Sequence, residues 1–404
     1  MPAQQRLDFA QPLKGAGSTS ELTKRLKHAH TQLRDFDQDL VDTSSLDDLA
    51  AQLRQPNLLL HKDKGVKAYA AACLVDVLRL YAPEAPYTPA QLKVRPTSLA
   101  PLSRSRSLQD IFDFLIRQFR YVGNPTDPHQ AEYFFVVDSL ASVKSVVLVC
   151  DLDAADDLIE RVFREAFDTI STSSPKNVEL ALCDILLALL EEVPNVPTPV
   201  TDILTAQFLP RAIKQRPAAH RLATEVCRGA TDKLQRYVSQ YFGETIVSAM
   251  NGGAGGRGGG MSSDDDDMDQ DDEDDDDDDD EDGVAVSKKR RARKAKSKAK
   301  GKLKESNGGS SRAGGDKDDD LPSALVEAHD LIRSLNRHVP ALLLNVIPQL
   351  AEELTTSSPA YRRLATGALG AMFGEPVGRG DLAKAFPAVW KEWLRRSKDV
   401  DATV

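Results

Sequence analysis

Apolar residues recur at helical spacing through most of the chain, in successive segments of about 15 residues each. The segment LQDIFDFLIRQFRYV shows the spacing i, i+3, i+4, i+7 with Leu108, Ile111, Phe112, Leu115, Ile116 and Phe119. No segment alternates apolar and polar residues with the period of two that a half-buried strand needs. The sequence therefore predicts an all-α protein.

The helices come in pairs that are joined by short turns marked by Pro or Ser. Several second helices share a loose pattern: an apolar or aromatic residue, then a charged residue, with apolar residues four, seven and eight positions after the first. The pattern follows the turns DKG, SPK and SPA, and its copies are Val66-Lys67 with Ala70, Cys73 and Leu74, Val178-Glu179 with Leu182, Ile185 and Leu186, and Tyr361-Arg362 with Ala365, Ala368 and Leu369. Only a neighbouring hairpin can bury the apolar face of such a hairpin, so the hairpins must stack. Because the copies are degenerate, we predict an α-solenoid of HEAT-type helical hairpin repeats.

A segment of different composition interrupts this series. Residues 251–260 are almost all glycine, 17 of the 19 residues in 264–282 are acidic, and 11 of the 17 residues in 288–304 are basic. The two charged blocks sum to -6 of the net charge of -10, so the remaining chain is close to balanced. A segment with so little to bury is expected to be disordered.

These patterns predict four regions. We expect a disordered N-terminus over 1–17, HEAT-like repeats over 18–245, a disordered Gly, acidic and basic segment over 246–320, and HEAT-like repeats over 321–404, where the array is truncated. Within the first set of repeats, the run AEYFFVVDSLASVKSVVLVC over 131–150 is apolar on most sides. Its length favours a buried helix over a strand.

The basic block has two compatible interpretations. A dense cluster of Lys and Arg in an accessible loop is typical of a nuclear import signal, and its residues are Lys288, Lys289, Arg290, Arg291, Arg293, Lys294, Lys296 and Lys298. The block also suits weak, non-specific contact with DNA phosphates, although it has no interleaved aromatic residues on which bases could stack. The acidic run suits either a contact with histones or a solubilising spacer.

The sequence shows no constellation of catalytic or metal-binding residues. The seven histidines and four cysteines are scattered without CxxC or HExxH spacing, and the glycines precede no GK[ST]. Each cysteine lies in an apolar context, which is typical of a small buried hydrophobic residue in a reducing compartment. No stretch reaches the roughly 18 apolar residues of a membrane span, and we expect no signal peptide. We predict a non-enzymatic protein without cofactor or membrane partner.

The stretch LRLYAPEAPYTP places prolines at 83, 86 and 89 directly after a helical run. One proline would end the helix, so the additional prolines suggest either an inter-repeat linker or a rigid surface element. Prolines fix φ and force an extended path. On the second interpretation Tyr81, Glu84 and Tyr87 stand on a stiff ridge, which costs little entropy to engage.

The same stretch carries a resemblance to a known family. ACLVDVLRLYAPEAPYT followed by IFDFLIRQFRYV resembles the cohesin-associated "precocious dissociation of sisters" protein five family, in its N-terminal portion. PALLLNVIPQLAEELTTSSPAYRRLATGALGAMFGEP and VWKEWLRRSKDV are similar to later helices of that family, and the run over 131–150 resembles its long helix with a Val-Lys-Ser turn. The likeness covers most of 20–245 and 321–400.

This chain departs from the family pattern in three ways. Family members are much longer, residues 93–107 (KVRPTSLAPLSRSRS) look like a loop insertion or a mis-spliced piece, and the charged segment occupies a turn between two helices. A solenoid tolerates such insertions because its loops emerge at the edge of the array.

The resemblance implies a nuclear, chromatin-associated scaffold that binds cohesin, including its kleisin subunit, and regulates sister chromatid cohesion. It also implies that residues 82–85 dock short peptide motifs of cohesin regulators, with residues 86 and 87 as supports. The expected partner-binding residues are Tyr81, Ala82, Pro83, Glu84, Ala85, Pro86 and Tyr87. The alternatives are another nuclear helical-repeat adaptor, such as a transport receptor or phosphatase scaffold, and a chromatin or histone binder that uses the acidic segment.

Overall fold

The structure is a computed structural model that describes residues 4–9, 11–82, 100–250, 322–374, 381–401 and 404. Along these residues, helix follows helix. All of these residues belong to one unit, made of residues 1–257 and 320–404. Its α-helices are α1 (Thr19–Arg34), α2 (Asp47–Leu53), α3 (Pro56–Leu59), α4 (Lys64–Tyr81), α5 (Ala100–Arg117), α6 (Phe119–Val122), α7 (Gln130–Ser142), α8 (Ala155–Thr169), α9 (Lys176–Glu192), α10 (Thr198–Ala206), α11 (Pro210–Gln215), α12 (Pro217–Gly229), α13 (Thr231–Met250), α14 (Ser323–His338), α15 (Ile347–Glu353), α16 (Pro359–Gly374), α17 (Asp381–Ala385) and α18 (Pro387–Arg395). The 3-10 helices are η1 (Leu13–Gly15), η2 (Thr43–Leu46), η3 (Ser145–Asp151), η4 (Pro340–Leu343) and η5 (Arg396–Lys398).

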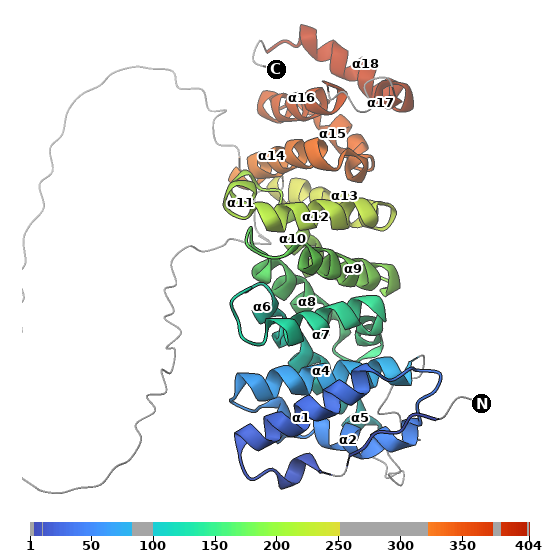
Figure 1. Ribbon diagram of the computed structural model, residues 1–404. Coiled ribbons are helices and arrows are strands. Elements are labelled where there is room, and N and C mark those ends of the chain that lie inside the picture. Colours follow the sequence, from blue (N-terminus) through green and yellow to red (C-terminus); the bar gives the residue numbers. More distant parts are fainter. Residues whose placement is uncertain (1–3, 10, 83–99, 251–321, 375–380, 402–403) are drawn as a thin grey trace, which may run out of the picture. The chain divides into compact units, whose positions relative to one another are not determined.

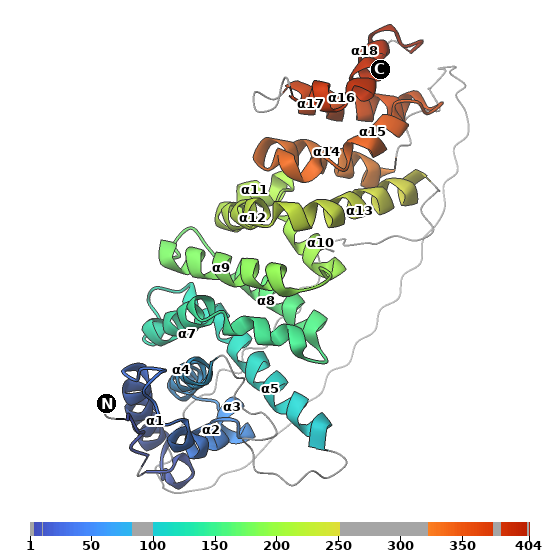
Figure 2. The same ribbon diagram turned by 90° about the vertical axis from the view of Figure 1, so that its right-hand side faces the viewer.

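The helices stack in the order of the sequence, as Figures 1 and 2 show. One layer is the succession α1, α4, α7, α9 and α12, in which each helix packs against the next. A second layer contains α6, α8, α10 and α13, again packed in sequence, and α14 and α16 continue the stack. The buried apolar side chains form one continuous cluster from Leu7 to Phe373. The prediction of an all-α array of HEAT-type hairpins is confirmed.

The shared pattern of the second helices marks the buried core of the stack. Its copies fall in α4, α9 and α16. All of its aliphatic and cysteine members are 0% exposed: Val66, Ala70, Cys73, Leu74, Val178, Leu182, Ile185, Leu186, Ala365, Ala368 and Leu369. Each of these helices is therefore covered by its neighbours, as the stacking argument requires.

The N-terminal residues are not disordered where the structure describes them, so that prediction is wrong for 4–9 and 11–17. The backbone N–H of Gln5 donates to the carbonyl of Leu40 (3.0 Å), and the N–H of Asp42 donates to the carbonyl of Gln5 (2.8 Å). Leu7 and Leu13 are buried in the same core as α1. The buried leucines and the backbone hydrogen bonds together hold this polar segment on the first hairpin.

The run over 131–150 is not one continuous helix. α7 ends at Ser142, Lys144 adopts a left-handed conformation (φ 56°), and η3 follows. The break lets Val146 and Val149 turn back into the core, where both are buried. The prediction of a single helix is wrong, whereas the Val-Lys-Ser turn implied by the resemblance is present.

The elements on either side of that break also bear on membrane insertion. In the described part of the chain, no single helix is both long and apolar enough to cross a bilayer. α7 and η3 pass that test only as a pair, and they are bent by 68° at their junction.

Two predicted boundaries also differ from the structure. α5 begins at Ala100, so residues 100–107 are helical and not part of a loop insertion, while residues 93–99 lie outside the described residues. α13 continues to Met250, beyond the predicted end of the first repeats at residue 245. The remainder of the predicted disordered segment, from residue 251, lies outside the described residues.

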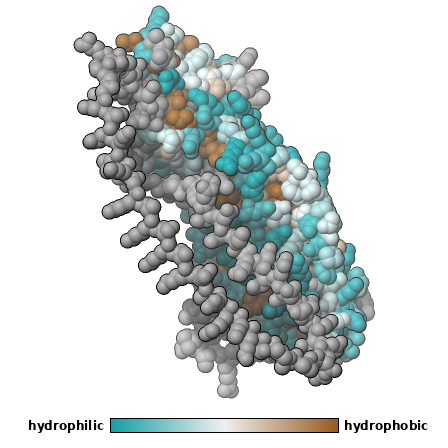
Figure 3. Space-filling model, turned by 90° about the vertical axis from the view of Figure 1, so that its left-hand side faces the viewer, coloured by the Kyte–Doolittle hydropathy of each residue, from teal (hydrophilic) through white to brown (hydrophobic). Residues whose placement is uncertain are grey.

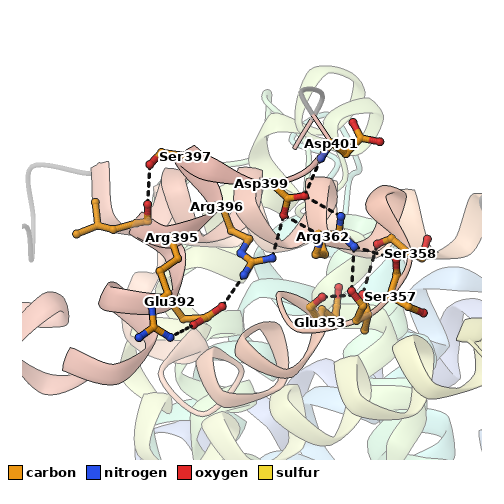
Figure 4. A network of polar contacts seen from close by, with 12 residues as sticks. Glu353, Ser357, Ser358, Arg362, Glu392, Arg395, Arg396, Ser397, Asp399 and Asp401 are labelled. Atoms are coloured by element: carbon orange, nitrogen blue, oxygen red, sulfur yellow. Dashed lines mark hydrogen bonds and ion pairs between the residues drawn. The ribbon is translucent and has the colours of Figure 1, made fainter.

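Arg362 anchors the last described turn to the stack (Figure 4). This arginine is 9% exposed and donates through Nε and Nη2 to the Asp399 carboxylate (2.9 and 2.8 Å). Its Nη1 donates to the carbonyls of Thr356 and Ser357 (3.0 and 2.9 Å). The bond from Arg362 is the main reason why the pKa of Asp399 falls to about 2. One guanidinium thus ties the turn before α16 to the turn after α18.

Two histidines meet at the joint between α12 and α14. The imidazole rings of His220 and His338 lie 4.4 Å apart in an edge-to-face arrangement. Each Nδ1 lies near a backbone carbonyl, that of Gln207 for His220 (3.2 Å) and that of Ser334 for His338 (2.8 Å). Burial, and then the neighbouring His338, lower the pKa of His220.

This joint predicts a loss of stability in mild acid. Because the fold lowers the pKa of His220, the folded protein favours the neutral ring, and the stabilisation is complete above the unfolded pKa of about 6.5. It decreases as the pH falls through that value toward the lowered pKa. We expect the melting temperature to drop between about pH 7.5 and pH 5.5, and His220→Phe to reduce this drop. His28→Phe, at an exposed position on α1, should leave it unchanged. An identical pH dependence in both variants would contradict the prediction.

Candidate protein-docking site at the end of helix α4

The structure describes the base of the predicted docking segment. Tyr81 is the last residue of α4, and Ala82 is its C-cap. Pro83, Glu84, Ala85, Pro86 and Tyr87 lie outside the described residues, as do the predicted import residues between 288 and 298. The described part of the candidate site consists of Tyr81, Ala82 and the contacts that hold them.

Asp76 is a fully buried carboxylate in the otherwise apolar helix α4. Its Oδ2 lies 2.7 Å from Nδ1 of His30 on α1, and its Oδ1 lies 3.3 Å from Nη2 of Arg79. A buried carboxylate is costly unless it is paired and hydrogen-bonded. These contacts supply both partners and join α4 to α1.

Arg79 continues this connection at the end of α1. Its Nη2 donates to the carbonyl of Leu33 (2.7 Å), and its Nη1 donates to the carbonyl of Phe36 (3.0 Å). The last carbonyls of a helix have no partner within the helix, and a cation is favourable at that end of the helix dipole. Arg79 thus fixes the end of α1 against the end of α4.

Tyr81 is anchored in the protein and is only 8% exposed. Its hydroxyl lies 3.0 Å from the carbonyl oxygen of Thr43 and 2.8 Å from Oδ1 of Asp47, so it bridges to η2 and α2. The prediction that Tyr81 stands on an exposed ridge is wrong, because the last turn of α4 still faces the core. This residue supports the segment from below.

The chain leaves α4 at Ala82 in a defined direction. Ala82 has φ -56° and ψ 143°, the extended conformation that a residue before proline prefers. Its N–H donates to the carbonyl of Arg79 (3.3 Å), and its carbonyl accepts a hydrogen bond from Nε2 of Gln38. The backbone is therefore held on both sides of the residue that precedes Pro83.

The sequence analysis missed four of these supporting residues: His30, Gln38, Asp76 and Arg79. Two charged residues three positions apart in ACLVDVLRLY were a usable signal, because a charge inside an apolar helix needs a buried partner. Nothing in the local sequence of Gln38 indicates that it reaches Ala82 across 44 positions.

Charged side chains line a further hollow on the described surface. A hollow of about 500 Å³ beside α8 is lined by Arg117, Arg120, Asp157, Glu160, Arg161, Arg164 and Glu165. Its arginines are paired with carboxylates, for example Arg120 with Glu165 (2.7 Å). On the face shown in Figure 3, hydrophobic residues form small scattered groups among hydrophilic ones. The described residues contain no group of three metal-ligating side chains.

The cysteines are unsuited to nucleophilic chemistry. Cys73 and Cys227 are buried, as predicted, while Cys150 and Cys183 are half-buried. Burial raises the pKa of Cys150 and Cys183 to about 11 and that of Cys227 to about 12. A thiol needs to ionise near neutral pH in order to act as a nucleophile, so these thiols stay protonated.

Comparison with known proteins identifies similar sequences over almost the whole chain. The family model described as "Sister chromatid cohesion protein PDS5 protein" matches residues 20–94 and 98–404. Sister chromatid cohesion protein pds5 of Schizosaccharomyces pombe is 26% identical over 392 residues, which cover 95% of this chain and 26% of that protein. Sister chromatid cohesion protein PDS5 of Saccharomyces cerevisiae is 30% identical over 242 residues, 58% of this chain and 18% of that protein. The chain thus spans about a quarter or less of these relatives.

A solved structure has the same fold. It is described as "Structure of the Pds5-Scc1 complex and implications for cohesin function", and its similar chain aligns with a TM-score of 0.71 and 23% sequence identity. The alignment covers all of this chain and 51% of that chain. The stacked helical hairpins seen here are therefore an architecture known from experiment.

The buried network predicts that Asp76 is a major support of the first hairpins. Asp76→Asn removes a charge that pairs with both His30 and Arg79, and we expect it to lower the free energy of unfolding by on the order of 2–4 kcal/mol. Asp35→Asn is a matched control, because Asp35 is exposed at the end of α1, and it should change stability by about 0.5 kcal/mol or less. Urea unfolding of both variants measures the difference, and equal effects would contradict the role of Asp76.

Proposed function

Because the chain belongs to the family of sister chromatid cohesion protein PDS5, we propose that it is a non-enzymatic scaffold that associates with cohesin and regulates sister chromatid cohesion. The observation that carries this proposal is the family match, which spans nearly all of the helical repeats. Since the chain spans only 26% of the S. pombe relative, we assign to it the task that stacked repeats can perform by themselves, which is docking.

The proposed mechanism is the recruitment of protein segments, without covalent chemistry. Helical repeats present a long surface on which extended partners bind. The solved neighbour is a complex of Pds5 with Scc1, so we propose the kleisin subunit of cohesin as one partner. Short peptide motifs of cohesin release and maintenance factors are the second kind of partner. The paired arginines and the un-ionised thiols described above support a scaffold over an enzyme.

We propose residues 82–85 as the docking element for these motifs, with Pro86 and Tyr87 as supports. The prolines restrict the backbone of this segment before a partner arrives, so that less conformational entropy is lost on binding. The contacts of Arg79, Tyr81 and Gln38 support this proposal, because they hold the point from which the segment leaves the stack.

We further propose that the protein is nuclear and associated with chromatin. The basic residues between 288 and 298 are the proposed import signal. Contacts of the charged blocks with DNA or histones would be weak and sensitive to salt.

The docking proposal predicts the effect of a charge reversal at Glu84. We expect Glu84→Lys to reduce the recovery of cohesin regulators with the tagged chain from nuclear extract, while the melting temperature stays unchanged. The extract is held at a salt concentration that strips contacts made by the charged blocks, and bound proteins are quantified by mass spectrometry. Asp138→Lys, at an exposed position on α7, is the matched control.

The three outcomes of this experiment separate the levels of the proposal. Cohesin components that are enriched and reduced only by Glu84→Lys support both the family function and the docking element. Enrichment that neither substitution changes keeps the scaffold and rejects residues 82–85. The absence of cohesin components rejects cohesin association and favours another helical-repeat adaptor.

The import proposal predicts that deletion of residues 288–304 moves a tagged protein out of the nucleus. The deletion removes 11 basic residues from the chain. A matched deletion of residues 264–282, which removes the acidic run, should leave the protein nuclear. Fluorescence microscopy of both variants measures the distribution, and nuclear retention without residues 288–304 would refute the import role.

A further inference from the structure

One side of α13 packs against the turn that contains η4 and the start of α15. Residues 251–321 lie between α13 and this turn in the sequence. Nε2 of Gln235 donates to the carbonyl of Ala341 (2.8 Å), and Oγ of Ser239 donates to the carbonyl of Asn345 (3.0 Å). Nε2 of Gln349 donates in return to the carbonyl of Ser239 (3.0 Å). Backbone carbonyls of an irregular turn need partners, and here α13 provides them.

The residues of α13 that make this contact are spaced so that they share one face of the helix. Gln235, Ser239 and Gly243 are four positions apart, so they lie on one face of the helix. The last of them allows the close approach of Gln349, because a Cβ atom at Gly243 would lie 3.1 Å from Nε2 of Gln349. The two sides therefore fit each other in both shape and polarity.

A second group of contacts joins α14 to the helices before the gap. Oγ of Ser334 donates to the carbonyl of Phe208 (2.6 Å), and this bond is buried. Nη2 of Arg228 donates to the carbonyl of His338 (3.2 Å), next to the His220 and His338 rings. As on α13, each side of the interface supplies both side-chain donors and backbone carbonyl acceptors.

Apolar side chains fill the space between these polar contacts. α13 contributes Leu234, Val238, Phe242 and Ile246, each at most 4% exposed, and the other side contributes Leu335, Leu342, Leu343 and Val346, each at most 1% exposed. All of them belong to the single core cluster. A buried apolar centre bordered by hydrogen bonds is the composition of a stable protein–protein interface.

From these contacts we infer that residues 322–404 bind residues 100–250 through an interface that holds without the covalent connection between them. We call this interface the seam. The covalent connection through residues 251–321 contributes only an entropic term to the binding free energy. This term changes slowly with the number of residues in the connection. The integrity of the array is then independent of cleavage within residues 251–321.

A cleavage experiment on the full chain tests this inference. A recognition sequence for a specific protease is inserted within residues 251–321, and the folded protein is cleaved under native conditions. The products are then separated by size-exclusion chromatography at high salt, which screens the charged blocks. Co-elution of the two fragments at micromolar concentration is the expected result. Separate elution, or precipitation of either fragment, would overturn the inference.

Substitutions at adjacent positions of α13 locate the interface. Ser239→Leu adds bulk at the seam and removes the hydroxyl that donates to the carbonyl of Asn345 and accepts from Nε2 of Gln349 (3.1 Å). Gln240→Leu places the same leucine at an exposed neighbouring position. In the cleaved protein, a labelled fragment should exchange with its unlabelled copy at least about tenfold faster when the protein carries Ser239→Leu than when it carries Gln240→Leu. This ratio corresponds to about 1.4 kcal/mol of binding free energy. Circular dichroism of the uncleaved variants confirms that both fold. Equal exchange rates would exclude this face of α13 as the interface.

Discussion

The whole structure depends on one constraint: a helical hairpin with one apolar face cannot bury that face alone. The aliphatic and cysteine members of the shared pattern are 0% exposed in all three second helices, and the neighbouring helices provide the cover. The core is therefore continuous along the stack. The described repeats consequently form one packed unit, which holds α4 and its C-cap Ala82.

Buried polar residues act at the joints of this stack. Asp76 joins α1 to α4, Arg362 joins the turn before α16 to the turn after α18, and His329 joins α14 to α15. Both ring nitrogens of His329 face acceptors at 2.9 Å, the carbonyl of Leu325 and the carboxylate of Glu353. Apolar packing leaves some freedom for helices to slide, while a paired charge holds only in one geometry.

Predictions from the sequence were correct where the interactions are local and wrong where contacts between distant segments decide the structure. Periodicity identified the helices and their buried faces, because that signal is local and repeated. It failed at Lys144, where a left-handed residue splits an apolar run, and at residues 4–9 and 11–17, where the buried Leu7 and Leu13 lie in an otherwise polar segment. It also misplaced Tyr81, since burial of a residue at a helix end is decided by the neighbouring elements.

The sequence by itself determined the fold class, the hairpin repeat, the charged interruption and the family, because each is written in residue type and spacing. The tertiary structure decided how Ala82 is held: Gln38 and Arg79 act between residues more than 40 positions apart. It also decided that α13 and the η4 turn meet, although residues 251–321 lie between them. Such pairings depend on which faces remain uncovered once the helices have packed, and no local pattern specifies them.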